Sequence, residues 1–307
     1  MSEKIFSLHK GKRPLLVSLP HVGTEIPKDM QADYVPQALE VEDTDWHLAS
    51  LYALAKHIGA SLLAPRHSRY VIDLNRPPEN TPMYAGANNT ELCPTRSFGG
   101  QALYKEGHAP DEAEIEYRRR AYWQPYHDAL GTELERIKEK HGYAVLWDGH
   151  SIKSVLPWLF EGTLPDLNLG TAGGTSCAPG LAAALGHVLA TQNKFTHAID
   201  GRFKGGYITR HYGHPEEHVH AVQLEMCFSC YMHEEPPYMV DAARAGKLLP
   251  VLRSLLLTAL ACDLQSDLSS EATVIFPKSP KSPPPATARD PGFPPPPAGE
   301  GEGGGNA

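Results

Sequence analysis

The chain has 307 residues, of which 28 are Lys or Arg and 36 are Asp or Glu, so its formal net charge is −8 with His neutral. No basic stripe interrupts this acidic balance, and we expect no nucleic-acid partner, because binding to phosphates needs clustered Lys and Arg. No positively charged start is followed by an apolar run of the kind that a signal peptide needs, and no run approaches ~18 apolar residues. We therefore expect no membrane partner and a soluble, cytoplasmic protein.

Strand-like apolar runs alternate with helical patterns along most of the chain. The runs occupy residues 14–19, 61–64, 69–74, 143–147 and 220–224. Apolar periodicity and stop signals such as Gly59 and Gly142 predict helices over about 45–57, 111–140, 178–190 and 240–261. The alternating order of strands and helices predicts an α/β fold with a largely parallel sheet and helices on both faces.

Two stretches depart from this alternation. Residues 76–110 are rich in Pro, Gly, Asn and Thr and too long for an ordinary connection, so we expect a functional loop there. Residues 277–307 hold ten of the 28 prolines and have almost nothing to bury, which predicts a disordered tail. A polyproline ligand for an aromatic groove is the alternative for this tail. Residues 1–276 are predicted to form one domain.

The five cysteines are an odd count scattered over a long chain, which does not indicate a disulfide framework. Cys227 and Cys230 form a CxxC pair, but no second pair completes a four-sulfur zinc site. We expect reduced thiols, half-buried at the end of a strand.

Four of the apolar runs end in residue types that metal-dependent hydrolysis needs. These endings are His21, Asn75 with Arg76, His150 in the sequence Asp148-Gly-His, and Glu225. In an open parallel sheet, ligands bind in the crevice at the carboxyl ends of the strands. We therefore expect the four endings to converge on one site.

His21 and His150 are the expected metal ligands, with Asp148 placed to hold the His150 tautomer from behind. A catalytic zinc takes three protein ligands, and two histidines with a carboxylate are one common set. The third ligand is Glu25, four residues after His21, or Asp45, at the start of the first predicted helix, where it would also serve as an N-cap. Spacing alone leaves this choice open.

The motifs in the chain resemble those of the N-formylglutamate deformylase (N-formylglutamate amidohydrolase) family. The resemblance runs from about Pro14 to Cys262 and rests on Ser18–Gly23, Asp43–His47, Ser68–Pro78, Leu92–Thr95, Asp148–Ser151, Gly201–His211 and Gln223–Glu225. It implies a three-layer αβα fold, phosphorylase/hydrolase-like and related to the zinc carboxypeptidases. It also implies hydrolysis of N-formyl-L-glutamate to glutamate and formate, in histidine breakdown.

The resemblance also implies roles for individual residues. It favours Asp45 as the third ligand of Zn²⁺ or another divalent metal, because Asp45 belongs to the family motif and Glu25 does not. The carboxypeptidases carry a Glu three residues after their first zinc His, and this chain has Thr24 there instead. Asn75 and Arg76 match the pair that grips a substrate carboxylate in the wider superfamily, and Glu225 matches its catalytic Glu.

The chemistry expected of these residues is consistent with such an activity. Glu225 would move a proton from water to the departing amine, since an amide leaves poorly unless it is protonated. Arg76 can hold a carboxylate with two parallel hydrogen bonds. A dicarboxylate substrate invites more cations, and the candidates beside the Gly205-Gly206 turn are Arg202, Lys204 and Arg210.

Two other activities stay open at this stage. The chain could remove a different acyl group from an N-acyl amino acid, or it could be a non-catalytic carboxylate-binding protein on the same fold. A general base beside a metal, as expected for Glu225, favours the enzyme. In every case the expected partner is a small molecule.

Overall fold

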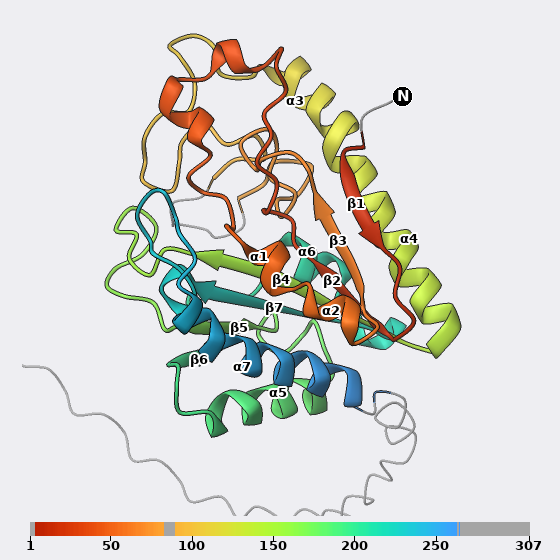
Figure 1. Cartoon of the computed structure of the whole chain (residues 1–307). Helices are drawn as coiled ribbons and strands as arrows, with labels where there is room; N and C mark the ends of the chain where they lie inside the picture. Colours follow the sequence, from red (N-terminus) through yellow and green to blue (C-terminus); the bar gives the residue numbers. More distant parts are fainter. Residues whose placement is uncertain (1–3, 83–89, 263, 265–307) are drawn as a thin grey trace, which may run out of the picture. The chain divides into compact units, whose positions relative to one another are not determined.

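The computed structural model describes residues 4–82, 90–262 and 264. It contains one seven-stranded sheet in the order β1-β3-β2-β4-β7-β5-β6 (Figure 1). The strands are β1 (Phe6–His9), β2 (Leu15–Ser18), β3 (Ser61–Pro65), β4 (Ala144–Ile152), β5 (Leu167–Gly170), β6 (His197–Ile199) and β7 (Val219–Cys227). Neighbours in the β3-β2-β4-β7 core are parallel, while β1 joins β3 and β5 joins β7 antiparallel. The prediction of a mixed α/β fold with a mostly parallel sheet is confirmed.

Helices cover both faces of this sheet. They are α1 (Leu48–Leu51), α2 (Leu54–His57), α3 (Glu112–Arg118), α4 (Gln124–His141), α5 (Pro179–Thr191), α6 (Tyr207–Tyr212) and α7 (Ala242–Ala261). The 3₁₀ turns are η1 (Gln31–Asp33), η2 (Pro36–Glu40), η4 (Pro215–Glu217) and η5 (Phe228–Cys230), and a π-helical turn, η3 (Arg119–Trp123), joins α3 to α4. In Figure 1, α5 and α7 lie together on one side of the sheet and α4 runs beside β1.

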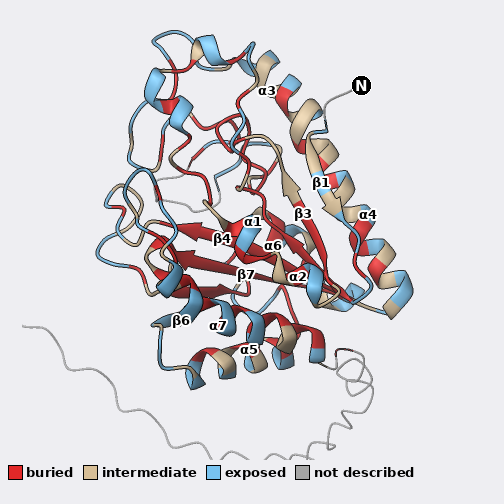
Figure 2. Cartoon of the chain, in the orientation of Figure 1, coloured by how far each residue is buried: buried red, intermediate tan, exposed pale blue. Residues whose placement is uncertain are grey.

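The two faces of the sheet bury two separate apolar cores. Alternation along β4 directs Val145 and Trp147 into the core shared with α5 and α7, and Ala144 and Leu146 into the core shared with α4. The central strands are buried along their whole length, as Figure 2 shows. This parity also decides the face of each polar residue farther along β4.

Several sequence predictions of individual elements need correction. Residues 70–74 are buried but form turns, because Tyr70, Val71 and Leu74 give their carbonyls to side chains and not to a neighbouring strand. The helix predicted over 45–57 is split into α1 and α2. The helix predicted over 111–140 contains the π-helical turn, and its start is capped by the Asp111 side chain, which accepts from the Glu114 N–H.

Four short elements were not predicted: β1, β5, β6 and α6. The strands β4 and β7 also extend past the predicted ends, and pair with each other as far as Ile152 and Cys227. The glycine Gly149 therefore lies within a strand, where a Cβ would meet Leu19 Cδ2 at 2.7 Å. The absence of a side chain there permits close packing against Leu19.

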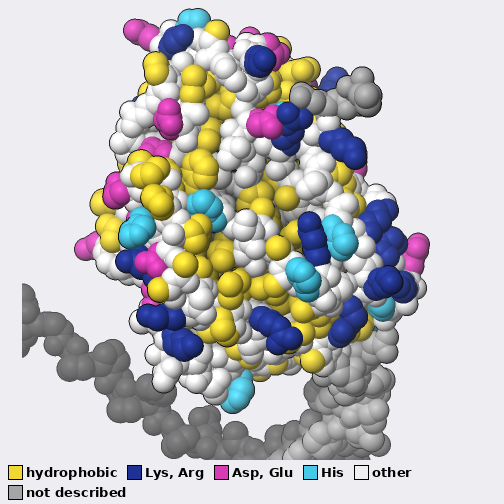
Figure 3. All heavy atoms as spheres, in the orientation of Figure 1, with side chains coloured by type: hydrophobic (Ala, Val, Ile, Leu, Met, Phe, Trp, Pro, Cys, Tyr) yellow, Lys and Arg dark blue, Asp and Glu magenta, His cyan; other side chains and the backbone are white. Residues whose placement is uncertain are grey.

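The tail predicted over 277–307 lies outside the described residues. Within the described part of the chain, no helix combines the length and hydropathy needed to cross a membrane. On the face drawn in Figure 3, Lys and Arg side chains are interspersed with acidic and hydrophobic ones.

Candidate active site

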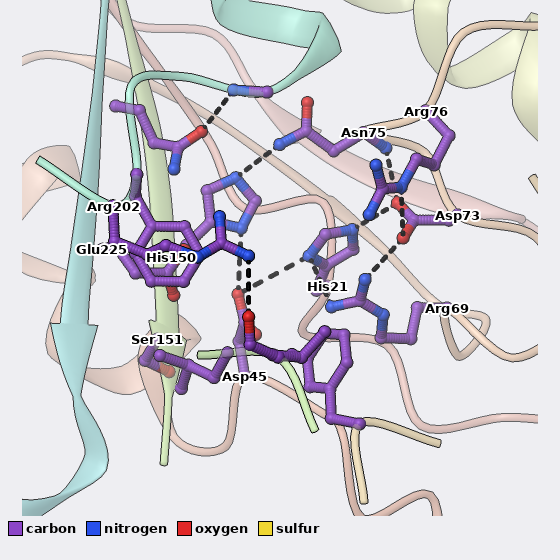
Figure 4. Close-up of a pocket in the computed structure, with 16 residues that line it drawn as sticks. His21, Asp45, Arg69, Asp73, Asn75, Arg76, His150, Ser151, Arg202 and Glu225 are labelled. Carbon is purple, nitrogen blue, oxygen red and sulfur yellow. Dashed lines mark hydrogen bonds and ion pairs between the residues drawn. The ribbon is translucent and has the colours of Figure 1, made fainter. Parts of the chain in front are cut away.

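Three buried potential metal ligands meet near the carboxyl ends of β2 and β4. His21, Asp45 and His150 offer ligand atoms that all lie within 4.8 Å of one another. His21 follows β2, and His150 lies near the end of strand β4. The Asp45 N–H donates to the His21 carbonyl at 2.9 Å. Figure 4 shows the Asp45 carboxylate between the two imidazole rings, whose centroids are 4.9 Å apart.

A second carboxylate lies behind each imidazole. His21 Nε2 donates to Asp73 Oδ1 at 2.7 Å, and His150 Nε2 lies 3.1 Å from Asp148 Oδ1. The Nδ1 atoms of both rings therefore face Asp45 Oδ2, at 3.9 Å for His21 and 3.3 Å for His150. A carboxylate behind a ligating histidine fixes the tautomer and makes the imidazole a stronger ligand.

The three side chains fit a divalent metal. Asp45 Oδ2 is buried and has no hydrogen-bond partner, which is costly for a carboxylate unless a cation compensates it. Two ligands at ~2.1 Å from a tetrahedral zinc lie about 3.4 Å apart, close to the separations of Asp45 Oδ2 from the two nitrogens. Two imidazoles with one carboxylate are also a donor set that catalytic zinc uses.

Burial and charge tune the two histidines in opposite directions. Burial, aided by the Arg69 cation, lowers the pKa of His21, which favours the neutral ring that a metal needs. Burial alone would lower the pKa of His150, but the carboxylates of Asp148 and Asp45 outweigh it and raise that pKa well above its usual range. Without a cation, a proton on His150 therefore balances these two acids.

Glu225 lies beside this cluster on β7. It is 7% exposed, and its Cα is the register partner of the His150 Cα in the parallel β4–β7 ladder. Burial, together with the charges of Asp45 and Asp148, raises the pKa of Glu225 to about 8 against the lowering effects of His150 and Arg69. A metal ion nearby would favour the ionised carboxylate and lower this pKa.

A cavity of about 90 Å³ opens at the cluster and is lined by three arginines, Arg69, Arg76 and Arg202. Arg69 pairs with Asp73 at 2.5 Å and lies over the Phe98 ring, 4.3 Å from its centroid. The Arg76 Nη2 donates to Thr90 Oγ1 at 2.9 Å. Three cations around one cavity favour an anionic ligand with more than one carboxylate.

Arg202 comes from the loop after β6 and donates to the Leu159 carbonyl at 3.1 Å. Lys204 and Arg210, predicted beside it, are exposed and do not line the cavity. The Arg210 side chain instead donates to the Gly205 carbonyl at 2.9 Å. The basic residues crowd together in the sequence, but the turn at Gly205 and the start of α6 direct two of them to solvent.

Asn75 reaches the cluster from the segment between β3 and α3. Its Nδ2 lies 3.0 Å from His150 Nε2 and 3.3 Å from Asp148 Oδ2, and its Oδ1 accepts from the Ile208 N–H at 2.8 Å. Asn75 therefore contacts the back of a metal-ligand candidate as well as lining the cavity.

Of the two carboxylates that spacing left open, Asp45 lies in the cluster. The Glu25 side chain is 48% exposed and pairs with Arg66 at 2.5 Å, away from the two histidines. The bend at Gly23 explains this, because a Cβ on Gly23 would meet the His67 carbonyl oxygen at 2.1 Å. The chain therefore passes close to residues 66–67 before it reaches Glu25.

Sequence reasoning did not single out Arg69, Asp73 and Phe98, which also line the cavity. The signal for Asp73 was present, since this carboxylate interrupts the same apolar run two residues before Asn75. Phe98 belongs to the long segment 76–110, whose predicted functional role agrees with this placement. The thiols of Cys227 and Cys230 are buried and free, and they bond to carbonyls at 165 and 166.

Comparison with other proteins gives a consistent picture. The model of the family described as N-formylglutamate amidohydrolase matches residues 13–232. Relatives called N-formylglutamate deformylase from Pseudomonas putida and from Pseudomonas aeruginosa strain PAO1 are each 48% identical over 259 residues, covering 84% of this chain and 97% of the relative.

Two solved structures resemble the model. An N-formylglutamate amidohydrolase from Ralstonia eutropha JMP134 has a TM-score of 0.68 and 26% identity, covering 83% of this chain and 96% of its own. A gene product of Agrobacterium tumefaciens, with a TM-score of 0.62 and 19% identity over 88% of this chain and 97% of its own, shares the fold. On the match to the family model and to the Pseudomonas relatives, this chain belongs to the N-formylglutamate amidohydrolase family.

Proposed function

We propose that this protein hydrolyses N-formyl-L-glutamate to L-glutamate and formate with the help of a divalent metal, Zn²⁺ in the first instance. The observation that carries the proposal is the orphaned Asp45 Oδ2 between His21 and His150, next to the buried Glu225. The names of the Pseudomonas relatives support the substrate.

His21, Asp45 and His150 would hold the metal. A bound zinc lowers the pKa of water towards ~7 and polarises a carbonyl oxygen. Glu225 accepts a proton from the attacking water and returns it to the amine nitrogen as the formyl C–N bond breaks. One water is consumed, and formate and the free amino acid are released.

The arginines of the cavity would hold the substrate. Arg76 and Arg202 both line the cavity, and two guanidinium groups there suit a dicarboxylic amino acid. Arg69 lies 3.3 Å from His21 Nδ1, so it adds positive charge next to the metal ligands. Lys204 and Arg210 have no part in this arrangement.

Three further predictions from the resemblance belong to the same proposal. They are a phosphorylase/hydrolase-like fold related to the zinc carboxypeptidases, a role in histidine breakdown, and a cytoplasmic location. The mostly parallel sheet with its site at the carboxyl strand ends supports the first of them.

The test combines metal analysis with formate release from N-formylglutamate, before and after chelation. We expect about one metal per chain, loss of turnover on chelation and recovery on adding Zn²⁺. N-acetylglutamate in the same assay separates this proposal from deacylation of other N-acyl amino acids. Formate release that survives complete metal removal would contradict the metal role.

His21→Ala and His150→Ala should each lower bound zinc well below one per chain and abolish turnover, because each removes one of three ligands. His187→Ala is the matched control, since His187 is exposed on α5. Full metal content in both ligand variants would show that the metal is held elsewhere.

A further inference from the structure

Residues 70–76 bring Asp73, Asn75 and Arg76 to the site without belonging to any strand. Backbone carbonyls along this segment are bound by side chains from other elements. The Tyr34 hydroxyl donates to the Tyr70 carbonyl at 2.8 Å, for example. The position of the site residues therefore depends on whichever elements supply these donors.

One long helix supplies three of the donors. Arg118 Nη1 donates to the Val71 carbonyl at 3.2 Å, His127 Nε2 to the Leu74 carbonyl at 2.9 Å, and Trp123 Nε1 to the Arg76 carbonyl at 3.1 Å. All three side chains are buried, with 2–4% of their surface exposed. The carbonyls of Leu74 and Arg76 flank Asn75 on both sides.

The π-helical turn η3 explains how these three side chains share a face. In a regular α-helix, residues five apart point about 140° away from each other, because each residue turns the chain by ~100°. The wider turn at Arg119–Trp123 absorbs one additional residue, so Trp123 returns to the side of Arg118. His127 follows four residues later on the same side, and its ring stacks on Trp123 with centroids 3.7 Å apart.

The local chemistry fixes the direction of the His127 hydrogen bond. Burial lowers the pKa of His127 to about 3, so the ring is neutral. The Leu74 carbonyl can only accept, so the single ring proton lies on Nε2, and Nδ1, 3.0 Å from the Tyr212 hydroxyl, carries none. A neutral buried donor without catalytic contact points to a structural task at the site.

We propose that the π-helical turn allows the α3–α4 helix to position the substrate-binding residues. Trp123 and His127 hold the backbone that carries the side chains of Arg76 and Asn75. Trp123 and His127 are positioning residues, because they reach the cavity only through the backbone of residues 74–76. The inference rests on the proposed function in that Arg76 is taken to bind a substrate carboxylate.

Trp123→Phe is the sharpest test, since it removes one N–H donor and keeps an aromatic ring on His127. We expect KM for N-formylglutamate to rise about fivefold, the equivalent of one hydrogen bond of ~1 kcal/mol, with kcat within twofold and metal content unchanged. Ser61→Ala is the control, because it removes a buried hydrogen bond to Glu133 on the same α4 helix, remote from residues 70–76. It should lower stability and leave KM unchanged.

Two variants at His127 separate its hydrogen bond from its bulk. His127→Gln keeps an N–H donor near the position of Nε2, whereas His127→Leu removes it. We expect KM for the Gln variant to lie between those of the unaltered protein and the Leu variant. Equal KM values for the Gln and Leu variants, both raised, would show that ring packing and not the hydrogen bond matters.

A double-mutant cycle tests whether Trp123 acts through Arg76. In an Arg76→Lys background, Trp123→Phe should raise KM less than in the unaltered protein, because the paired hydrogen bonds that it would misalign are already lost. If the two effects on KM multiply, or if Arg76→Lys raises KM and Trp123→Phe does not, the positioning role is overturned.

Hydrogen exchange of peptides covering residues 70–76 provides a readout that needs no turnover. Exchange there should be several-fold faster in Trp123→Phe and unchanged in Ser61→Ala. Equal exchange in Trp123→Phe and the unaltered protein would overturn the inference. Absence of formate release from the unaltered protein would contradict only the proposed function, and exchange would still decide whether the helix holds the segment.

Discussion

The carboxyl group of Glu225 is buried among other acids, with Asp45 and Asp148 both raising its pKa. Such a carboxyl group ionises readily only when a cation is close by. The binding of the metal and the ionisation of the general base in the proposed reaction therefore depend on each other. The same carboxylate that would accept a proton from water would also compensate the charge of the metal.

Replacing Glu225 by Gln keeps the shape of the side chain and removes its proton acceptor. We expect kcat to fall by ~10²–10⁴ while bound metal stays at the level of the unaltered protein. Steady-state kinetics with metal analysis on the same samples measure both quantities. Turnover close to normal would show that another group moves the proton.

The raised pKa of Glu225 also predicts a pH dependence of stability in metal-free protein. The unfolded carboxyl ionises near pH ~4.3, whereas the folded one keeps its proton up to about pH 8. Since the folded pKa is raised, the stabilisation present below the unfolded pKa is lost as pH rises through the folded value. Glu225 therefore makes the free energy of unfolding fall between about pH 4.3 and 8.

Denaturant unfolding with chelator at pH 5, 6.5 and 8 measures this effect. Glu225→Gln should gain stability over the unaltered protein as pH rises, because it has no proton to lose. Each pKa unit by which folding raises the pKa of Glu225 corresponds to about 1.4 kcal/mol in the free energy of unfolding. Saturation with Zn²⁺ should reduce this gain in the stability of Glu225→Gln. A gain of the same size at pH 5 and pH 8 would contradict the raised pKa of Glu225.

At the scale of elements, the turn before α6 packs directly on Asn75. A Cβ on Gly206 would meet Asn75 Nδ2 at 2.3 Å, while the Gly206 N–H donates to Gln223 Oε1 at 2.7 Å. The close approach therefore couples the turn after β6 to the amide that contacts His150.

Gly206→Ala should displace the Asn75 side chain and lower kcat/KM at least tenfold, with a far-ultraviolet circular dichroism spectrum like that of the unaltered protein. Gly246→Ala is the matched control, because Gly246 is exposed on α7 and a Cβ there meets nothing within 4 Å. The control should retain full activity and gain up to ~1 kcal/mol in stability. Full activity of Gly206→Ala would show that Asn75 is free to move.

Local patterns predicted the parallel core and the convergence of His21, His150 and Glu225, because apolar runs and the residues at their ends are read directly from the sequence. They did not predict β1 and β6, whose residues are half-exposed or exposed. They also predicted a strand over residues 70–74. A buried apolar run has the same sequence pattern whether its carbonyls accept hydrogen bonds from a neighbouring strand or from a side chain such as Arg118.

The choice between Asp45 and Glu25 needed three-dimensional information. Both carboxylates lie in the segment between β2 and α1, and the close passage of Gly23 by His67 turns Glu25 towards Arg66. The same holds for Lys204 and Arg210, which differ from Arg202 only in the direction that a turn gives them. Such directions arise from contacts between segments far apart in the sequence.

At the scale of the molecule, the predicted tail over 277–307 contributes few residues able to form a core. Truncation after Pro277 should leave the melting temperature within about 2 °C and turnover essentially unchanged, since exposed termini of this composition add little packing. Differential scanning calorimetry and the formate assay on both lengths check this. A clear fall in either would mean that the segment docks on the fold.

The pairing of His150 with Glu225 in the β4–β7 ladder has a consequence for folding fidelity. A slip of one residue between these strands would turn Glu225 to the opposite face of the sheet, and a slip of two would move it by ~6.6 Å along the strand. Misregistered chains would retain secondary structure and lose the site. The specific activity of a preparation therefore reports the fraction of molecules in which β4 and β7 pair in the correct register. Spectroscopy of the backbone alone does not distinguish these molecules from misregistered ones.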